Sequence, residues 1–221
     1  MEKNIDQNFE KKRQQGENDS IISTLIRNDS VEEFISYVNR FNIYLCSQIE
    51  TSYYETNRFI MENNPSLIEY AAFFGSIQIF QYLRMNSIEL EPTLWLYAIH
   101  SKNAELIHII EEHMILEKND KIYEKCFFEA IKCHHNDIAN YIKDNYLLNS
   151  KINKIKIIEN GIHYLNYEFF PDDFNSDNEF NLLFKFNYIT LVDFFLEKNK
   201  TKIEWKIKIE IQFILSSFNC K

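Results

Sequence analysis

Pairs of apolar residues separated by one polar residue recur along the chain. This five-residue pattern occurs at Phe34–Val38, Ile79–Leu83, Leu106–Ile110, Ile138–Ile142 and Leu191–Phe195. The four apolar positions of each copy cover a stripe of one helix face that is wider than a coiled-coil seam. A helix with so wide an apolar face packs against neighbours on two sides. The recurrence of the pattern predicts stacked helical repeats.

A small residue precedes the three middle copies at a constant distance. Ala71, Ala98 and Ala130 each lie eight residues before the first apolar residue of their copy. A small side chain lets two helices approach closely, so each alanine marks the first helix of a pair. Ser66 and Glu69 have the spacing of a capping box at the start of one such helix. We predict antiparallel helix pairs at 66–85, 93–113 and 121–146.

Composition favours the same all-α architecture. The 221 residues include only three Gly and three Pro, and sheet proteins use these residues freely in their turns. Apolar residues make up 45% of the chain, which is typical of a folded protein. The sequence therefore predicts an all-α solenoid of stacked αα-hairpins.

The pattern divides the chain into three expected parts: a disordered tail at 1–15, the hairpin solenoid at 16–200 and a cap at 201–221. Within the solenoid, an extra helix is expected around residues 53–61. A helical stretch near 152–158 is followed by an acidic, aromatic loop at 167–177.

The cap has two competing patterns. Ile203, Trp205 and Ile207 alternate with polar residues as in a strand, whereas Ile207, Ile211 and Leu215 form a helix face. An extended piece followed by a capping helix accommodates both.

Charge and segment composition restrict the partners. Lys and Arg number 24 against 33 for Asp and Glu, a net charge of −9, which disfavours binding to nucleic acid. No window approaches the ~18 consecutive apolar residues of a membrane span, and the first residues lack the apolar core of a signal peptide. The four cysteines have no framework spacing and suit free thiols. We expect a cytoplasmic protein that binds no membrane.

The middle copies resemble ankyrin repeats. Residues 66–83 read Ser-Leu-Ile-Glu-Tyr-Ala-Ala-Phe-Phe-Gly-Ser-Ile-Gln-Ile-Phe-Gln-Tyr-Leu, which is similar to the T-P-L-H-x-A-A-x-x-G-H-x-E-I-V-x-L-L consensus of that family. Residues 93–110 and 125–142 keep fewer matches, and residues 178–195 have Leu183 at the alanine position. The sequence of these copies is similar to that of a divergent ankyrin-type domain of unknown function expanded in parasitic protists. Residues 87–92 lack the sequence that builds the family's β-hairpin finger.

The resemblance implies a binding face. In ankyrin repeats, the residues after the alanine pair face a concave groove. The matching positions here are Phe73, Phe74, His100, Ser101, Lys132 and Cys133. Aromatic side chains at such positions are typical anchors for a partner. The alternative is that Phe73 or Phe74 is a core residue that covers the preceding helix pair.

Motifs for chemistry are missing. The chain has no Gly-rich phosphate loop and no nucleophile elbow. Cys126, Cys133, His134 and His135 are candidate metal ligands but lack the close pairing of zinc knuckles, and His135 matches a structural turn histidine of the ankyrin family. The acidic residues at 172–179 lack the glycine of a calcium loop. We expect no catalytic residue, no metal, no cofactor and no small-molecule substrate.

Two functions are compatible with this sequence. The first is a non-catalytic protein–protein interaction module, an ankyrin-repeat scaffold or adaptor whose partner the sequence does not name. The second is a degenerate structural repeat segment of a longer chain with no partner of its own. Neither is an enzyme.

Overall fold

A computed structural model describes residues 7–86, 88–113, 120–147, 152–171 and 177–192. In these ranges the regular structure is helical, apart from one isolated antiparallel bridge between Gln48 and Ser66. The predicted all-α class is therefore confirmed. The chain divides into two compact units, 1–150 and 151–221, whereas the sequence pattern extends one solenoid over 16–200.

The first unit is a series of short helices. Along its described residues they are α1 (Gln7–Gln15), α2 (Ile21–Arg27), α3 (Val31–Phe41), α4 (Arg58–Asn63), α5 (Leu67–Phe74), α6 (Ile77–Met85), α7 (Leu94–Ser101), α8 (Ala104–His113), α9 (Asp120–Lys132) and α10 (Asn136–Tyr146).

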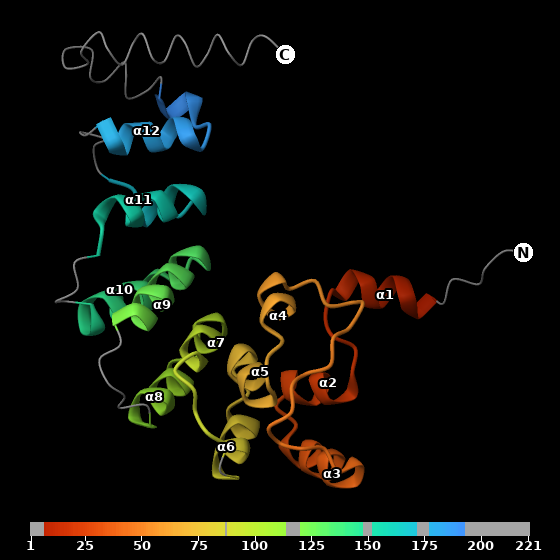
Figure 1. Ribbon diagram of the computed structural model, residues 1–221. Coiled ribbons are helices and arrows are strands. Elements are labelled where there is room, and N and C mark those ends of the chain that lie inside the picture. Colours follow the sequence, from red (N-terminus) through yellow and green to blue (C-terminus); the bar gives the residue numbers. More distant parts are fainter. Residues whose placement is uncertain (1–6, 87, 114–119, 148–151, 172–176, 193–221) are drawn as a thin grey trace, which may run out of the picture. The chain divides into compact units, whose positions relative to one another are not determined.

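Eight of these helices form two rows (Figure 1). The inner row is α2, α5, α7 and α9, in which each helix packs against the next. Each inner helix pairs with the helix that follows its turn, so α3, α6, α8 and α10 form an outer row. The helix pairs predicted at 66–85, 93–113 and 121–146 are confirmed, and α2 with α3 makes a fourth.

Small residues set the spacing of the inner row. Ala71, Ala98 and Ala130 have no exposed surface, as expected for residues at close helix–helix contacts. Much of the apolar pattern of the outer row faces inward: Ile79 and Phe80 of α6 are fully buried, although Ile138 and Tyr141 of α10 remain partly or fully exposed. The predicted capping box of Ser66 and Glu69 begins α5, with both reciprocal hydrogen bonds formed.

Every inner helix ends in the same backbone turn. The backbone is left-handed there, with φ between 51° and 73° at Asp29, Gly75, Lys102 and His134. The last three lie four residues after the buried alanines, and Asp29 lies four residues after Leu25. The amide of each left-handed residue donates to the carbonyl three residues earlier, and in three of the four turns the next amide donates to the carbonyl five residues earlier. This is the geometry of a Schellman turn. Glycine is the usual residue there, yet only one of these turns has it.

The residue after the left-handed position joins neighbouring hairpins. The Ser76 hydroxyl donates to the carbonyl of Ile26 at 2.5 Å, and Nδ1 of His135 donates to the carbonyl of Ile99 at 2.7 Å. Both carbonyls lie at the end of the preceding inner helix. The structural role expected for His135 in its turn is thus seen in the structure.

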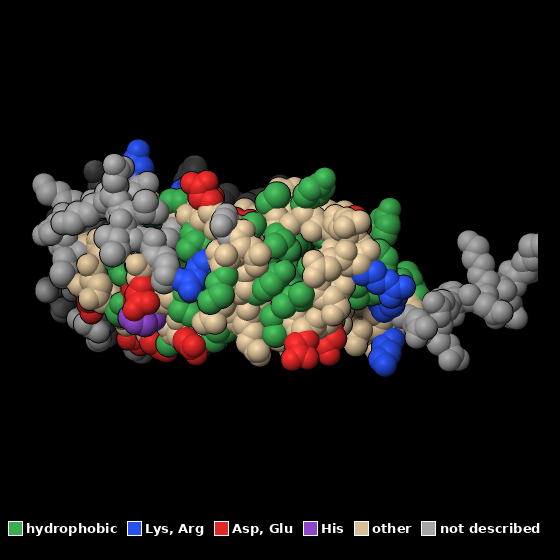
Figure 2. Space-filling view, turned by 90° about the horizontal axis from the view of Figure 1, so that it is seen from below, with side chains coloured by type: hydrophobic (Ala, Val, Ile, Leu, Met, Phe, Trp, Pro, Cys, Tyr) green, Lys and Arg blue, Asp and Glu red, His purple; other side chains and the backbone are tan. Residues whose placement is uncertain are grey.

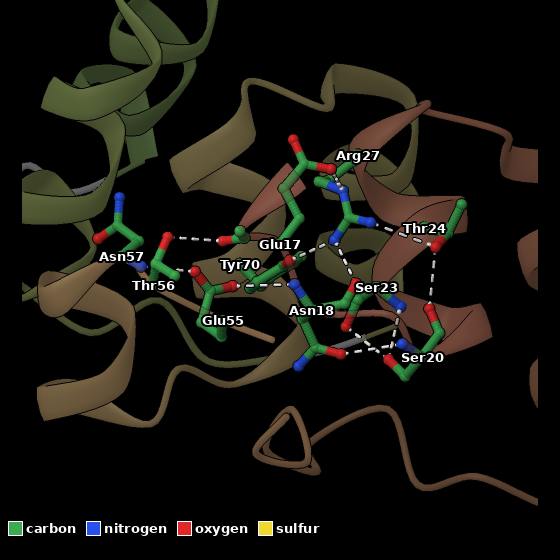
Figure 3. A network of polar contacts seen from close by, with 11 residues as sticks. Glu17, Asn18, Ser20, Ser23, Thr24, Arg27, Glu55, Thr56, Asn57 and Tyr70 are labelled. Atoms are coloured by element: carbon green, nitrogen blue, oxygen red, sulfur yellow. Dashed lines mark hydrogen bonds and ion pairs between the residues drawn. The ribbon is translucent and has the colours of Figure 1, made fainter. Parts of the chain in front are cut away.

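A long connector between α3 and α5 carries α4. Its polar residues form a network with the start of the first hairpin (Figure 3). The Glu55 carboxylate, 8% exposed as a residue, accepts hydrogen bonds from the backbone amides of Asn18 and Asn57 at 3.2 and 2.8 Å. Arg27 donates to the Asn18 carbonyl and to the Tyr70 hydroxyl at 2.8 and 2.9 Å. The network therefore ties the connector to α2 and α5.

This network positions α4. The Asn57 side chain caps the helix by accepting from the amides of Phe59 and Ile60. The extra helix predicted around 53–61 exists, but begins at Arg58. The residues from 53 to 57 are not helical, and within this stretch Glu55 accepts a hydrogen bond from the Asn18 amide.

The second unit repeats the turn. It contains α11 (Lys154–His163), a 3₁₀ turn at Tyr167–Phe169 and α12 (Asp177–Lys185). Its core comprises Ile158, Ile162, Leu182, Leu183 and Val192. Left-handed residues follow at Leu165 and Asn187, with φ of 58° and 60°, and the Tyr188 hydroxyl donates to the carbonyl of Ile162 at 3.0 Å.

Gly161 occupies the small position of a copy that the sequence pattern missed. A Cβ at Gly161 would lie 3.1 Å from the Cβ of Phe169, so a larger residue would require Phe169 to shift by a few tenths of an ångström. The helix that should follow is reduced to the 3₁₀ turn. The helical stretch predicted near 152–158 is confirmed as part of α11.

Two expectations at the termini differ in outcome. The disordered tail predicted at 1–15 is wrong for Gln7–Gln15, which form α1, and Lys12 of this helix makes an ion pair with Asp19 at 2.9 Å. The cap predicted at 201–221 lies outside the described residues, as do residues 172–176 of the acidic loop.

In the described ranges, no helix combines the length and apolar character needed to cross a membrane.

Candidate functional site

The six residues predicted for a concave face lie at the ends of three adjacent inner helices. Phe73 and Phe74 end α5, His100 and Ser101 end α7, and Lys132 ends α9 with Cys133 directly after it. Their exposure differs: Phe73 is buried, Lys132 is exposed, and the other four are partly buried.

Phe59 of α4 covers part of this face. Its ring centroid lies 4.4 Å from that of His100 and 5.9 Å from that of Phe73, and the Lys132 ammonium lies 6.0 Å from the same ring. The rings of Phe73 and His100 stack on each other at 4.6 Å. Phe73, with 8% exposure, is therefore a core residue beneath α4. Phe74 packs on Tyr70 instead, with centroids 4.7 Å apart.

A polar cluster lies beside these rings. Nε2 of His100 is 3.2 Å from Oε1 of Glu129, and the Cys133 Sγ is 3.5 Å from Nδ1 of His100. The same Glu129 oxygen accepts a hydrogen bond from the Lys132 ammonium at 2.9 Å. The structure therefore brings three of the six predicted residues together around a carboxylate that the sequence analysis did not single out.

The environment shifts two pKa values in this cluster. Burial works against ionisation of the Glu129 carboxyl, but hydrogen bonds from His100 and Lys132 outweigh it and hold its pKa below the usual range. Burial, assisted by the nearby Glu129 charge, raises the pKa of Cys133 to about 11. Cys133 is thus a neutral thiol at pH 7 and a weak nucleophile in this state.

The metal constellation considered from the sequence is not assembled. Cys126 is fully buried in the core, and His135 bonds to Ile99. Among the described residues, the group whose ligand atoms lie within 4.8 Å of one another is His100, Glu129 and Cys133. Glu129 and Cys133 are four residues apart, which is the one signal in the sequence that could have paired them.

A second site lies on the outer row. Figure 2, seen from the side of α3, α6 and α8, shows hydrophobic side chains grouped along this face with acidic side chains at its margins. A groove of about 500 Å³ runs between α8 and α10. Its residues are Lys102, Ala104, Ile107, His108, Glu111, Asp137, Ile138 and Tyr141.

Hydrogen bonds hold one end of the groove. The hydroxyls of Tyr141 and Tyr146 donate to the same Glu111 oxygen at 2.6 and 2.5 Å, which links α10 to α8. The hydrogen bond with Glu111 and burial raise the pKa of Tyr141, so its hydroxyl stays protonated as a donor. The groove therefore combines apolar side chains with a fixed polar end.

Comparison with known proteins gives no match to a family model, to a curated protein or to a solved structure. The class defined by the structure is thus an all-helical protein with recurring αα-hairpins, and the ankyrin resemblance stands on the sequence motifs alone.

Proposed function

We propose that this protein is a non-catalytic interaction module of ankyrin-like hairpins that binds a segment of another protein. The observation that carries the proposal is the groove between α8 and α10. Ala104, Ile107 and Ile138 give it apolar contact surface, and Glu111 and Asp137 place two carboxylates at it against one ammonium, Lys102. Concave sites with apolar lining and a few placed polar groups are typical of binding sites.

The groove suits an apolar side chain flanked by Lys or Arg. The apolar side chain would contact Ile107 and Ile138, while the basic group would lie near Asp137, which is exposed. The net charge of −9 favours approach of a basic segment and makes the association weaken with salt. The expected partner is thus a segment in which an apolar residue lies beside Lys or Arg.

The groove replaces the concave face as the main contact in this proposal. Phe59 packs over Phe73 and His100, so an incoming segment would have to displace α4 to reach them. Ser101, Lys132 and Cys133 remain partly or fully accessible and could contact a partner at the edge of α4.

Selection of short random peptides against the immobilised protein tests the proposal. Peptides with a basic residue beside an apolar one should be enriched. They should bind the unmodified protein more tightly at low salt than at high salt. Ala104→Tyr should reduce binding at least tenfold, because the exposed Ala104 lines the groove and a tyrosine would occupy it.

Glu105→Tyr is the matched control. Glu105 is the next residue of α8, is exposed and does not line the groove, so binding should be retained. Equal loss in both variants, or no loss in Ala104→Tyr, would refute the groove as the contact. If substitution of surface residues weakens the binding of none of the enriched peptides, the alternative function applies. The chain would then be a structural repeat segment of a longer chain without a partner of its own.

A further inference from the structure

The polar cluster at the ends of α7 and α9 has the composition and spacing of a metal site. We propose that His100, Glu129 and Cys133 bind one Zn²⁺ ion, with a fourth coordination position open to solvent or to a ligand. This site is independent of the groove on the outer row, and its existence does not require the proposed peptide binding.

The distances fit tetrahedral coordination. Neighbouring ligand atoms of a tetrahedral zinc site, with bonds of about 2.1 Å to N and O and about 2.3 Å to S, are about 3.4–3.6 Å apart. Here Nε2 of His100 is 3.2 Å from the Glu129 oxygen, and Sγ of Cys133 is 4.0 Å from each of these atoms. Shifts of about half an ångström, within the reach of side-chain rotation, would bring the three atoms onto one ion.

The backbone pre-positions two of the ligands. Glu129 lies in the last turn of α9 and Cys133 directly follows that helix, so the two residues share one face at a spacing of four. His100 comes from α7, which packs against α9 in the inner row. A site built from two packed helices needs little rearrangement to close around an ion.

Aromatic rings fix the third ligand. The imidazole of His100 stacks on Phe73 with an interplanar angle of 27° and contacts Phe59 from another side. Its side chain is 13% exposed and that of Glu129 is 15% exposed. The ligands are therefore held in a partly desolvated place that an ion can still enter from solvent.

The donor set selects the metal. A thiolate and an imidazole favour zinc over calcium or magnesium, which prefer oxygen ligands only. Zinc binding displaces the proton of the Cys133 thiol to solvent. The resulting thiolate and the Glu129 carboxylate together neutralise the two positive charges of the ion. Lys132 bonds to this same Glu129 oxygen at 2.9 Å, so its ammonium would move to the other carboxylate oxygen when zinc binds and support the ligand from there.

Cobalt titration of the purified, metal-free chain tests the site. Co²⁺ bound to a thiolate gives an intense sulfur-to-metal charge-transfer absorption in the near ultraviolet, and tetrahedral Co²⁺ gives visible bands. We expect both to saturate at one equivalent and to be lost when Zn²⁺ is added. Cys133→Ser should abolish the charge-transfer band, and Glu129→Gln should weaken binding at least tenfold.

Cys46→Ser is the matched control. Cys46 is also a free cysteine, but it is exposed and lies outside the cluster, so its loss should leave the cobalt spectrum unchanged. A band that persists in Cys133→Ser, or disappears in Cys46→Ser, would overturn the assignment. Absence of saturable binding in the parent protein would do the same.

A measurement on the parent protein covers the case in which Cys133→Ser fails to fold. Zinc should slow alkylation of Cys133 at least tenfold while Cys46 remains reactive, as followed residue by residue by mass spectrometry. A hundredfold excess of zinc over its Kd should raise the melting temperature by about 5–10 °C. Unprotected Cys133 at saturating zinc would refute the site even without a variant.

Discussion

The inner and outer rows of the first unit are built from the same hairpins but pack differently. Inner helices meet through alanines without exposed surface, and the bonds from Ser76 and His135 fix the spacing between neighbours. In the outer row, α8 and α10 are joined through the Glu111 carboxylate and leave a groove between them. One row thus defines the repeat, and the other leaves an open groove at the surface. Substitutions in the two rows should therefore have different consequences.

The largest difference should follow from enlarging a small residue. Ala98→Leu places three more carbon atoms at an inner contact with no exposed surface, and overpacking of this kind costs about 1–3 kcal/mol. The exposed Ala104 of α8 should accept the same change within about 0.5 kcal/mol. Urea unfolding measures both. Coincident midpoints for Ala98→Leu and the parent would show that Ala98 is not at a close contact.

A smaller effect should come from removing one bond between hairpins. Ser76→Ala leaves the Ile26 carbonyl without the hydroxyl that donates to it in a buried place, at a cost of about 1–2 kcal/mol. Ser30 is the corresponding turn residue of the first hairpin, for which the described structure has no earlier hairpin to contact. Ser30→Ala should therefore be close to neutral. Equal losses in the two variants would contradict the role assigned to the bond.

The smallest expected effect distinguishes a turn from a helix. Lys102 has φ of 54°, so Lys102→Gly should relieve backbone strain and stabilise the protein by about 0.5–1 kcal/mol. The same change at Lys143, inside α10 and exposed, should destabilise by about 1 kcal/mol. Thermal melts of the two variants should shift in opposite directions. Shifts of the same sign would mean that the left-handed backbone at Lys102 does not strain the folded protein.

The sequence predicted what depends on local periodicity. Helix pairs, the capping box and the buried alanines all have signals within about ten residues, and these predictions were confirmed. The turns themselves lie where the sequence places them, but their shared left-handed backbone was not predicted, because the residue in that conformation changes from Asp29 to Gly75 to Lys102. Backbone hydrogen bonds hold that conformation in each case, so the side chain need not be glycine.

The candidate sites depend on contacts distant in sequence. Glu129 is 29 residues from His100, and no local pattern shows that their side chains meet. Phe59 reaches the same place from the connector before α5, where the sequence predicts an extra helix but gives no sign of what that helix contacts. The groove is likewise a property of two helices that are not consecutive in the chain.

The bonds from turn residues to the preceding hairpin have a consequence for how such a chain can change. Because Ser76 and His135 hold neighbouring hairpins together at one end, the connectors at the other end are not what sets the stacking distance. A connector can then change in length while the scaffold keeps its register, provided that contacts such as that of Phe59 with Phe73 are kept. The segment with α4 is an example, since it inserts a helix between two hairpins whose inner helices still pack. For protein engineering, these connectors are the positions at which new loops or whole domains could be grafted.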